Sequence, residues 1–133
     1  MPNFQAVYYR AADGTEPVSD FIDRLDARRQ AILDNQIDRL NMLNPAYPHL
    51  PFPHSSQIEG ELRELRCHVG RERYRVLYRR SRNLIILLHI FRKDSGSVPH
   101  AEIKITNERW SDFKARMDAS GRHPPRAAGH DAP

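Results

Sequence analysis

The sequence lacks the features that several large protein classes require. Cys67 is its one cysteine, so no internal disulfide can form, and no second thiol stands at metal-ligand spacing. The longest apolar run, residues 84–88, is far too short to cross a bilayer, and the N-terminus lacks the basic and apolar segments of an export signal. We therefore expect a soluble, cytoplasmic protein that makes no contact with a membrane.

What the sequence does have is an uneven distribution of positive charge. Residues 61–93 contain nine Arg and one Lys against three Glu, a net charge of +7, whereas the whole chain has a net charge of +4. These basic residues alternate with apolar ones, as they do in β-strands. The sequence therefore predicts a cationic sheet surface, which is suited to binding the phosphates of a nucleic acid.

Apolar periodicity and turn residues predict a single α+β domain over residues 1–119. An N-terminal strand should precede a helical hairpin, whose helices begin near Pro17 and after a cap at Asp26. The helical hairpin should pack on a mainly antiparallel, twisted sheet, followed by a C-terminal helix that begins at Pro99. We expect strands over residues 4–9, 61–67, 74–80 and 84–91, and an extended, proline-rich connector over residues 44–53.

Two of these segments have distinctive composition. Residues 84–91 are apolar at nearly every position, which is typical of an inner strand covered on both faces. Residues 120–133 are rich in Gly, Pro, Ala and His and have little to bury, so we expect a disordered tail.

Strand alternation assigns the basic residues to faces of the sheet. One face of the third expected strand carries Arg73, Arg75, Leu77 and Arg79, and the other carries Tyr74, Val76 and Tyr78. The aromatic face suits packing on the helices, so the arginine face should be open to solvent. On the neighbouring strands, Arg66 and Lys93 can join Arg75 in one concave patch.

Four motifs in this region resemble a known family. They are Glu-Leu-Arg-Glu-Leu-Arg at 61–66, Tyr-Arg-Val-Leu-Tyr at 74–78, Leu-Leu-His-Ile-Phe-Arg-Lys at 87–93 and Pro-His-Ala-Glu-Ile at 99–103. Their order and spacing resemble the phage-derived HigB-like toxins of the RelE/ParE toxin superfamily. The resemblance implies the small RelE-like fold and a type II toxin that cleaves mRNA on the ribosome. It also implies a helix-turn-helix antitoxin as partner.

The sequence departs from that family pattern at two places. Residues 92–99 form a loop one residue longer than in many relatives, and this loop introduces Asp94 beside the expected site. Glu64 stands where better-known nucleases of the superfamily carry a lysine.

RNA cleavage by attack of the 2′-hydroxyl requires a base, an acid and cations near the phosphate. No cluster of Asp, Glu and His has metal-ligand spacing, so we expect neither a metal nor another cofactor. We expect Arg66 and Arg75 to bind the phosphate, Lys93 to act as clamp or acid, and His89 to act as acid or base. Further RNA contacts are expected from Arg73, Arg79 and Arg92.

Other interpretations of the same residues remain open. The arginines could pair with Glu61, Glu64 and Glu72, and His89 could be a hydrogen-bonded core residue. A superfamily member can also poison a topoisomerase by protein contact, which needs no convergent arginines. A non-catalytic RNA- or DNA-binding phage regulator would use the basic sheet only to hold a nucleic-acid backbone.

Overall fold

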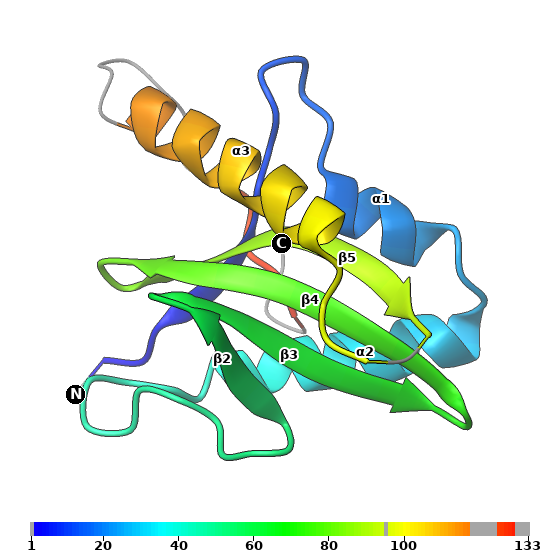
Figure 1. The fold of residues 1–133 in the computed structure, drawn as a ribbon. Coiled ribbons are helices and arrows are strands. Elements are labelled where there is room, and N and C mark those ends of the chain that lie inside the picture. Colours follow the sequence, from blue (N-terminus) through cyan, green and yellow to red (C-terminus); the bar gives the residue numbers. More distant parts are fainter. Residues whose placement is uncertain (1, 95, 118–124, 130–133) are drawn as a thin grey trace.

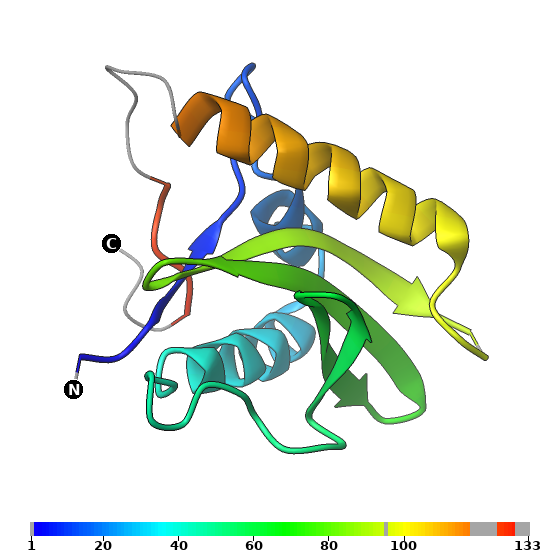
Figure 2. The same ribbon diagram turned by 60° about the vertical axis from the view of Figure 1, so that its left-hand side comes forward.

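The fold is a five-stranded sheet with helices on both faces (Figure 1, Figure 2). The computed structural model describes residues 2–94, 96–117 and 125–129. Its elements are β1 (Gln5–Tyr8), α1 (Pro17–Asp23), α2 (Ala27–Leu40), β2 (Ser55–Glu59), β3 (Leu62–Val69), β4 (Glu72–Ser81), β5 (Leu84–Lys93) and α3 (His100–Met117). The strand order is β1-β5-β4-β3-β2; β1 is parallel to β5 and the other neighbours are antiparallel. The predicted α+β fold is confirmed.

Local sequence determines where the two N-terminal helices begin. Pro17 stands at the start of α1, where its missing N–H costs no helical hydrogen bond. Asp26 caps α2, because its side chain accepts a hydrogen bond from the Arg29 backbone N–H at 3.0 Å. Leu33 and Ile37 follow at helical spacing and are fully buried against the sheet. Both predicted helix starts are therefore confirmed.

The aromatic face of β4 lies in the main core, as predicted. Tyr74 and Tyr78 pack there with apolar side chains of α1 and α2. β5 is covered on both faces: Leu87 belongs to the same core, whereas Leu88 packs with Phe113 of α3. The prediction of an inner strand is also confirmed, because β5 lies between β1 and β4.

The opposite face of β4 is not open, and this part of the prediction is wrong. Arg75 and Leu77 on that face are both 0% exposed. Val98 and Ile103 pack against the apolar cluster that contains Leu77, and α3 lies across this side of the sheet (Figure 2). Alternation along a strand assigns side chains to a face, but it does not show which face a later helix will cover.

β2 is a strand that the sequence analysis did not predict. It pairs with β3 at the edge of the sheet, with an irregular register between Gln57 and Glu59. Ile58 is its one large apolar residue, so the alternation that usually identifies a strand is absent. Gly60 follows with a φ of 53°, a conformation that favours glycine, and turns the chain into β3. β2 forms one wall of the site described below.

The C-terminal segment 125–129 lies along the outer edge of β1. The Tyr8 N–H donates to the Arg126 carbonyl at 2.9 Å, and the Ala128 N–H donates to the Ala6 carbonyl at 2.8 Å. The Arg126 guanidinium also lies 3.1 Å from a carboxylate oxygen of Glu16. These contacts cover a strand edge that would otherwise be unpaired.

The prediction of a disordered tail is therefore wrong for residues 125–129. Composition could not show this docking, because backbone groups and the small, fully buried Ala128 provide it. The rest of the predicted tail, residues 120–124 and 130–133, lies outside the described residues.

Candidate functional site

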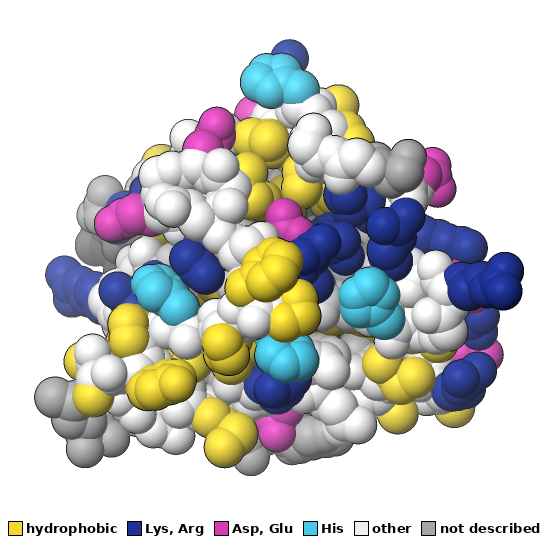
Figure 3. All heavy atoms as spheres, turned by 60° about the horizontal axis from the view of Figure 1, so that its bottom comes forward, with side chains coloured by type: hydrophobic (Ala, Val, Ile, Leu, Met, Phe, Trp, Pro, Cys, Tyr) yellow, Lys and Arg dark blue, Asp and Glu magenta, His cyan; other side chains and the backbone are white. Residues whose placement is uncertain are grey.

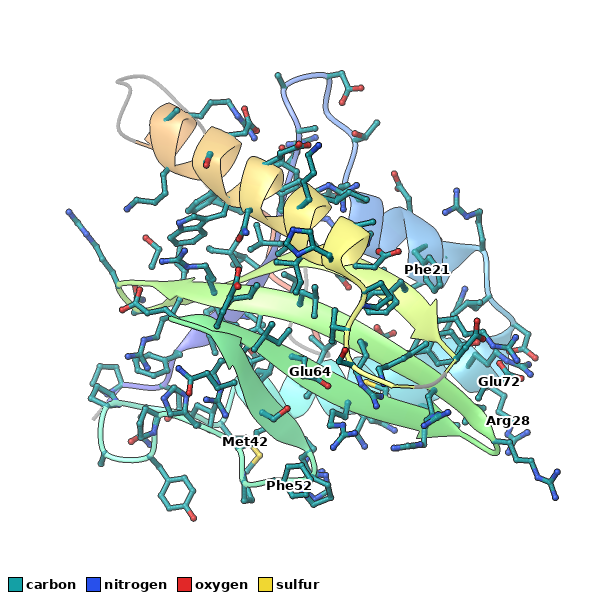
Figure 4. All side chains as sticks on the ribbon, viewed as in Figure 1. Phe21, Arg28, Met42, Phe52, Glu64 and Glu72 are labelled. Atoms are coloured by element: carbon teal, nitrogen blue, oxygen red, sulfur yellow. The ribbon has the colours of Figure 1, made fainter. Side chains whose placement is uncertain are left out.

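An ion-paired cluster joins the central parts of β3 and β4. Arg66 and Arg75 stand directly opposite each other across the two strands. Both guanidinium groups share the carboxylate of Glu64, whose Oε1 lies 2.8 Å from Arg75 Nε and 3.5 Å from Arg66 Nε. Glu64, which is labelled in Figure 4, thereby holds the buried Arg75 and the partly exposed Arg66 side by side.

Arg75 is charged, fully buried and incompletely hydrogen-bonded. Its Nη1 donates to the Tyr74 carbonyl at 3.2 Å, whereas its Nη2 has no hydrogen-bond partner in the described part of the chain. Burial lowers the pKa of Arg75, and the nearby Glu64 carboxylate opposes this effect. A buried guanidinium with an unused donor is costly unless a ligand or partner group satisfies it.

A cavity of about 450 Å³ opens beside this cluster. Its charged lining residues are Glu59, Glu64, Arg66 and Lys93, and the other walls come from the rest of β2, the 96–98 loop and Ile103. Desolvation lowers the pKa of Lys93, and the positive charge of Arg75 lowers it further. The structure thus brings Arg66 and Lys93 to one cavity and places Arg75 close behind them.

The three arginines predicted to contact RNA lie in different surroundings. Arg73 stands opposite Lys93 in the register of β4 and β5, so it adds positive charge beside the cavity. Arg92 is on the other face of β5, where its side chain is 60% exposed and lies 3.8 Å from Glu72.

Arg79 lies farther along β4 than Arg73 and Arg75. Its Nη2 is 3.1 Å from Glu61, and its guanidinium stacks over the Trp110 ring of α3 at 4.3 Å. Arg79 therefore already has two partners. The contact with Trp110 joins α3 to the sheet.

His89 does not line the cavity of Arg66 and Lys93. Its Nε2 contacts the Glu102 carboxylate, and its Nδ1 lies 2.9 Å from Arg109 Nη1. The ring also stacks on Phe91, with 5.7 Å between centroids. Burial lowers the pKa of His89, and Glu102 opposes this effect. These contacts support the alternative of a hydrogen-bonded structural histidine that joins β5 to α3.

Sequence reasoning missed the exposed aromatic residue beside Arg66. Phe52 is 73% exposed, and the Arg66 guanidinium lies 5.3 Å from the centre of its ring. In Figure 4 it lies below β2 and β3, outside the sheet. Figure 3 shows exposed hydrophobic side chains with Lys, Arg and His on both sides. A Phe flanked by Pro51 and Pro53 was the signal available in the sequence.

Three further observations limit the chemistry of the described residues. Within residues 2–94, 96–117 and 125–129, no group of three or more His, Cys, Asp and Glu could hold a metal ion. In the same ranges, no helix is long and apolar enough to span a membrane. Cys67 is buried, and burial raises its pKa to about 12, so its thiol stays protonated and is a poor nucleophile.

The fold and the family comparison define the class of protein. An N-terminal strand and two helices on a mainly antiparallel sheet, closed by a C-terminal helix, make the small α+β fold of the RelE/ParE toxins. The chain belongs to the family described as Phage derived protein Gp49-like (DUF891), whose model matches residues 20–111. This family comprises HigB-like toxins of that superfamily, so the resemblance found in the sequence is confirmed. No curated protein shows significant similarity to the chain.

Proposed function

We propose that this protein is the toxin of a type II toxin–antitoxin pair and cleaves mRNA on the ribosome. Family membership supports a toxin with an antitoxin partner, and RelE-like toxins are typically ribonucleases. The observation that carries the proposal is the cavity lined by Arg66 and Lys93, with the charge of Arg75 behind it. A helix-turn-helix antitoxin would neutralise the toxin, and a cytoplasmic location follows from a ribosomal target.

The cavity supplies the charges that the reaction needs. The 2′-hydroxyl oxygen attacks the phosphorus while a water molecule takes its proton, the bond to the 5′-oxygen breaks, and a 2′,3′-cyclic phosphate remains. Arg66 binds the phosphate oxygens through its planar guanidinium and stabilises the additional negative charge. Lys93 donates a proton to the departing 5′-oxygen, and Arg75 contributes positive charge from behind. Glu64 positions Arg66 rather than contacting RNA.

Replacing Arg66 or Lys93 by Ala should abolish growth arrest without unfolding the protein. Each variant removes a cation from the reacting phosphate, a change that costs about 100-fold or more in rate at comparable sites. Pulse labelling of protein synthesis after induction, with mRNA ends mapped in the same cells, measures the effect. The matched control is Arg28→Ala, which removes an exposed charge on α2 away from the cavity. Arrest that persists in both site variants would contradict the proposal.

The rate of cleavage should fall at alkaline pH, starting below the usual lysine range. Lys93 must be protonated to act as an acid, and its pKa is lowered by burial and by neighbouring arginines. Activity is therefore lost as the pH rises through this lowered value. The Lys93→Arg variant keeps the positive charge but should be slower and lack this alkaline limit, because arginine stays protonated there and donates its proton poorly. Identical pH profiles for both proteins would exclude Lys93 as the acid.

One observation favours a second candidate, a toxin that acts by protein contact on a topoisomerase. Met42, Tyr47 and Phe52 are 71%, 66% and 73% exposed, and exposed apolar groups of this kind are common at protein interfaces. The two candidates differ in their first effect on the cell. If protein synthesis continues while DNA supercoiling or replication fails, the topoisomerase candidate replaces the nuclease.

A further inference from the structure

A second cationic cavity lies on the opposite face of the sheet from the first. It has a volume of about 410 Å³ and is lined by Arg63 of β3, Arg80 of β4 and His49 of the connector before β2. Arg63 stands opposite Tyr78, whose side chain faces the main core, whereas Glu64 faces the first cavity. The two cavities are therefore separated by the sheet.

The positive charge of this second cavity is not neutralised from within. In the described part of the chain, neither Arg63 nor Arg80 lies within ion-pair distance of a carboxylate. Glu61 also lines the cavity, but its carboxylate pairs with Arg79 at 3.1 Å. The pKa of His49 is lowered by burial and then by the charges of Arg63 and Arg80, which places both charges near its ring.

Arg63 carries a donor that lacks an acceptor. Its Nε is buried and has no hydrogen-bond partner among the residues that the structure describes. Tyr78, Ile85 and Pro48 line the same cavity, so apolar surface lies beside the charge. Two guanidinium groups next to apolar surface suit a nucleotide, whose phosphate accepts from arginine and whose ribose or base packs on the apolar wall.

Gln57 connects the second cavity with the first, since this residue lines both. It belongs to β2, which forms the edge of the sheet. A ligand that passes around this edge can thus contact both faces of the protein. A flexible single strand with a phosphate on every nucleotide has that shape, whereas an acidic side chain of a protein partner would account for one cavity alone.

We infer that the cavity of Arg63 and Arg80 binds a backbone phosphate of the same RNA strand whose scissile phosphate lies at Arg66 and Lys93. The RNA passes around β2 at Gln57. This inference rests on the proposed function, because it takes RNA as the ligand. It assigns to this chain a second RNA contact that holds the strand and takes no part in the reaction.

The test uses the full chain and a short single-stranded RNA with 2′-O-methyl groups, which cannot be cleaved. Fluorescence anisotropy measures the dissociation constant over a range of salt concentrations. Arg63→Gln and Arg80→Gln should each weaken binding about tenfold and reduce the salt slope by about 0.7, the value for one lost phosphate contact on a single strand. Arg28→Gln, an exposed arginine of α2 outside both cavities, should change binding less than about twofold.

NMR gives a second readout that does not depend on a variant being folded. The Nε–H resonance of Arg63 in the unaltered protein should shift when the RNA is added, because the guanidinium group that carries it binds a phosphate. Equal affinities and equal salt slopes for the unaltered protein and both variants would overturn the inference. The inference would also be overturned if the Arg63 Nε–H resonance shifted only when an Asp- and Glu-rich peptide is added. The same holds if adenosine monophosphate shifted it as much as the RNA does.

Failure of this inference is distinguishable from failure of the proposed function. If growth arrest requires Arg66 and Lys93 while Arg63→Gln and Arg80→Gln bind RNA normally, only the second contact is refuted. If arrest does not require Arg66 and Lys93, the proposed function fails whatever the binding data show.

Discussion

Replacing Arg75 by Ala is expected to lower the free energy of unfolding by about 3–5 kcal/mol, because it leaves the Glu64 carboxylate buried without its closest cation. The residue is 0% exposed, so its removal also opens a space that the surroundings cannot easily fill. Urea unfolding followed by circular dichroism measures the change. Loss of activity in this variant would then reflect unfolding, whereas the sequence analysis placed Arg75 on an open surface.

Two variants separate charge from packing in this prediction. Arg66→Ala removes the partly exposed partner of the same carboxylate and should cost about 1 kcal/mol or less. Arg75→Met combined with Glu64→Leu removes both buried charges and should recover most of the lost stability. If Arg66→Ala and Arg75→Ala lower the free energy of unfolding equally, the buried ion pair does not account for the loss of stability in Arg75→Ala.

Removing the chain after residue 119 is expected to lower the free energy of unfolding by about 2–3 kcal/mol. The truncation deletes two backbone hydrogen bonds to β1, at about 1 kcal/mol each, and the burial of Ala128. It also leaves Asn41 Nδ2 without the Ala128 carbonyl, to which it donates at 3.0 Å. Thermal unfolding of the truncated and full chains gives the comparison.

The matched control for the truncation is Arg126→Ala in the full chain. This variant removes the ion pair with Glu16 but keeps the backbone hydrogen bonds, so it should cost about 1 kcal/mol or less. Equal melting temperatures for the truncated and full chains would show that the docked segment 125–129 adds no stability. In that case a domain ending at residue 119 would be sufficient, as composition alone predicts.

Local patterns in the sequence predicted the elements that depend on neighbouring residues. Asp26 and Pro17 act within one turn of their own helices, and the alternation of Tyr74 and Tyr78 is a property of a single strand. The same patterns could not predict β2, whose pairing depends on β3 rather than on its own polar residues.

The candidate site could be predicted in part, for the same physical reason. Strand alternation placed Arg66 and Arg75 on one face of the sheet, where the structure has them, but the burial of Arg75 depends on α3, which follows much later in the chain. The separation of His89 from the cavity likewise depends on Glu102 and Arg109 of α3. The role of each residue in RNA cleavage stays a prediction.

The parallel pairing of β1 has a consequence for the growing chain. β1 is made first, yet its inner partner is β5 and its outer partner includes Ala127, both of which are synthesised much later. Pairings between distant segments form slowly, so the apolar residues Val7 and Tyr8 stay unpaired while the arginine-rich hairpins can already close. An apolar strand without partners can pair with another nascent chain. Aggregation during rapid synthesis would therefore start at the N-terminal strand, not at the charged surface.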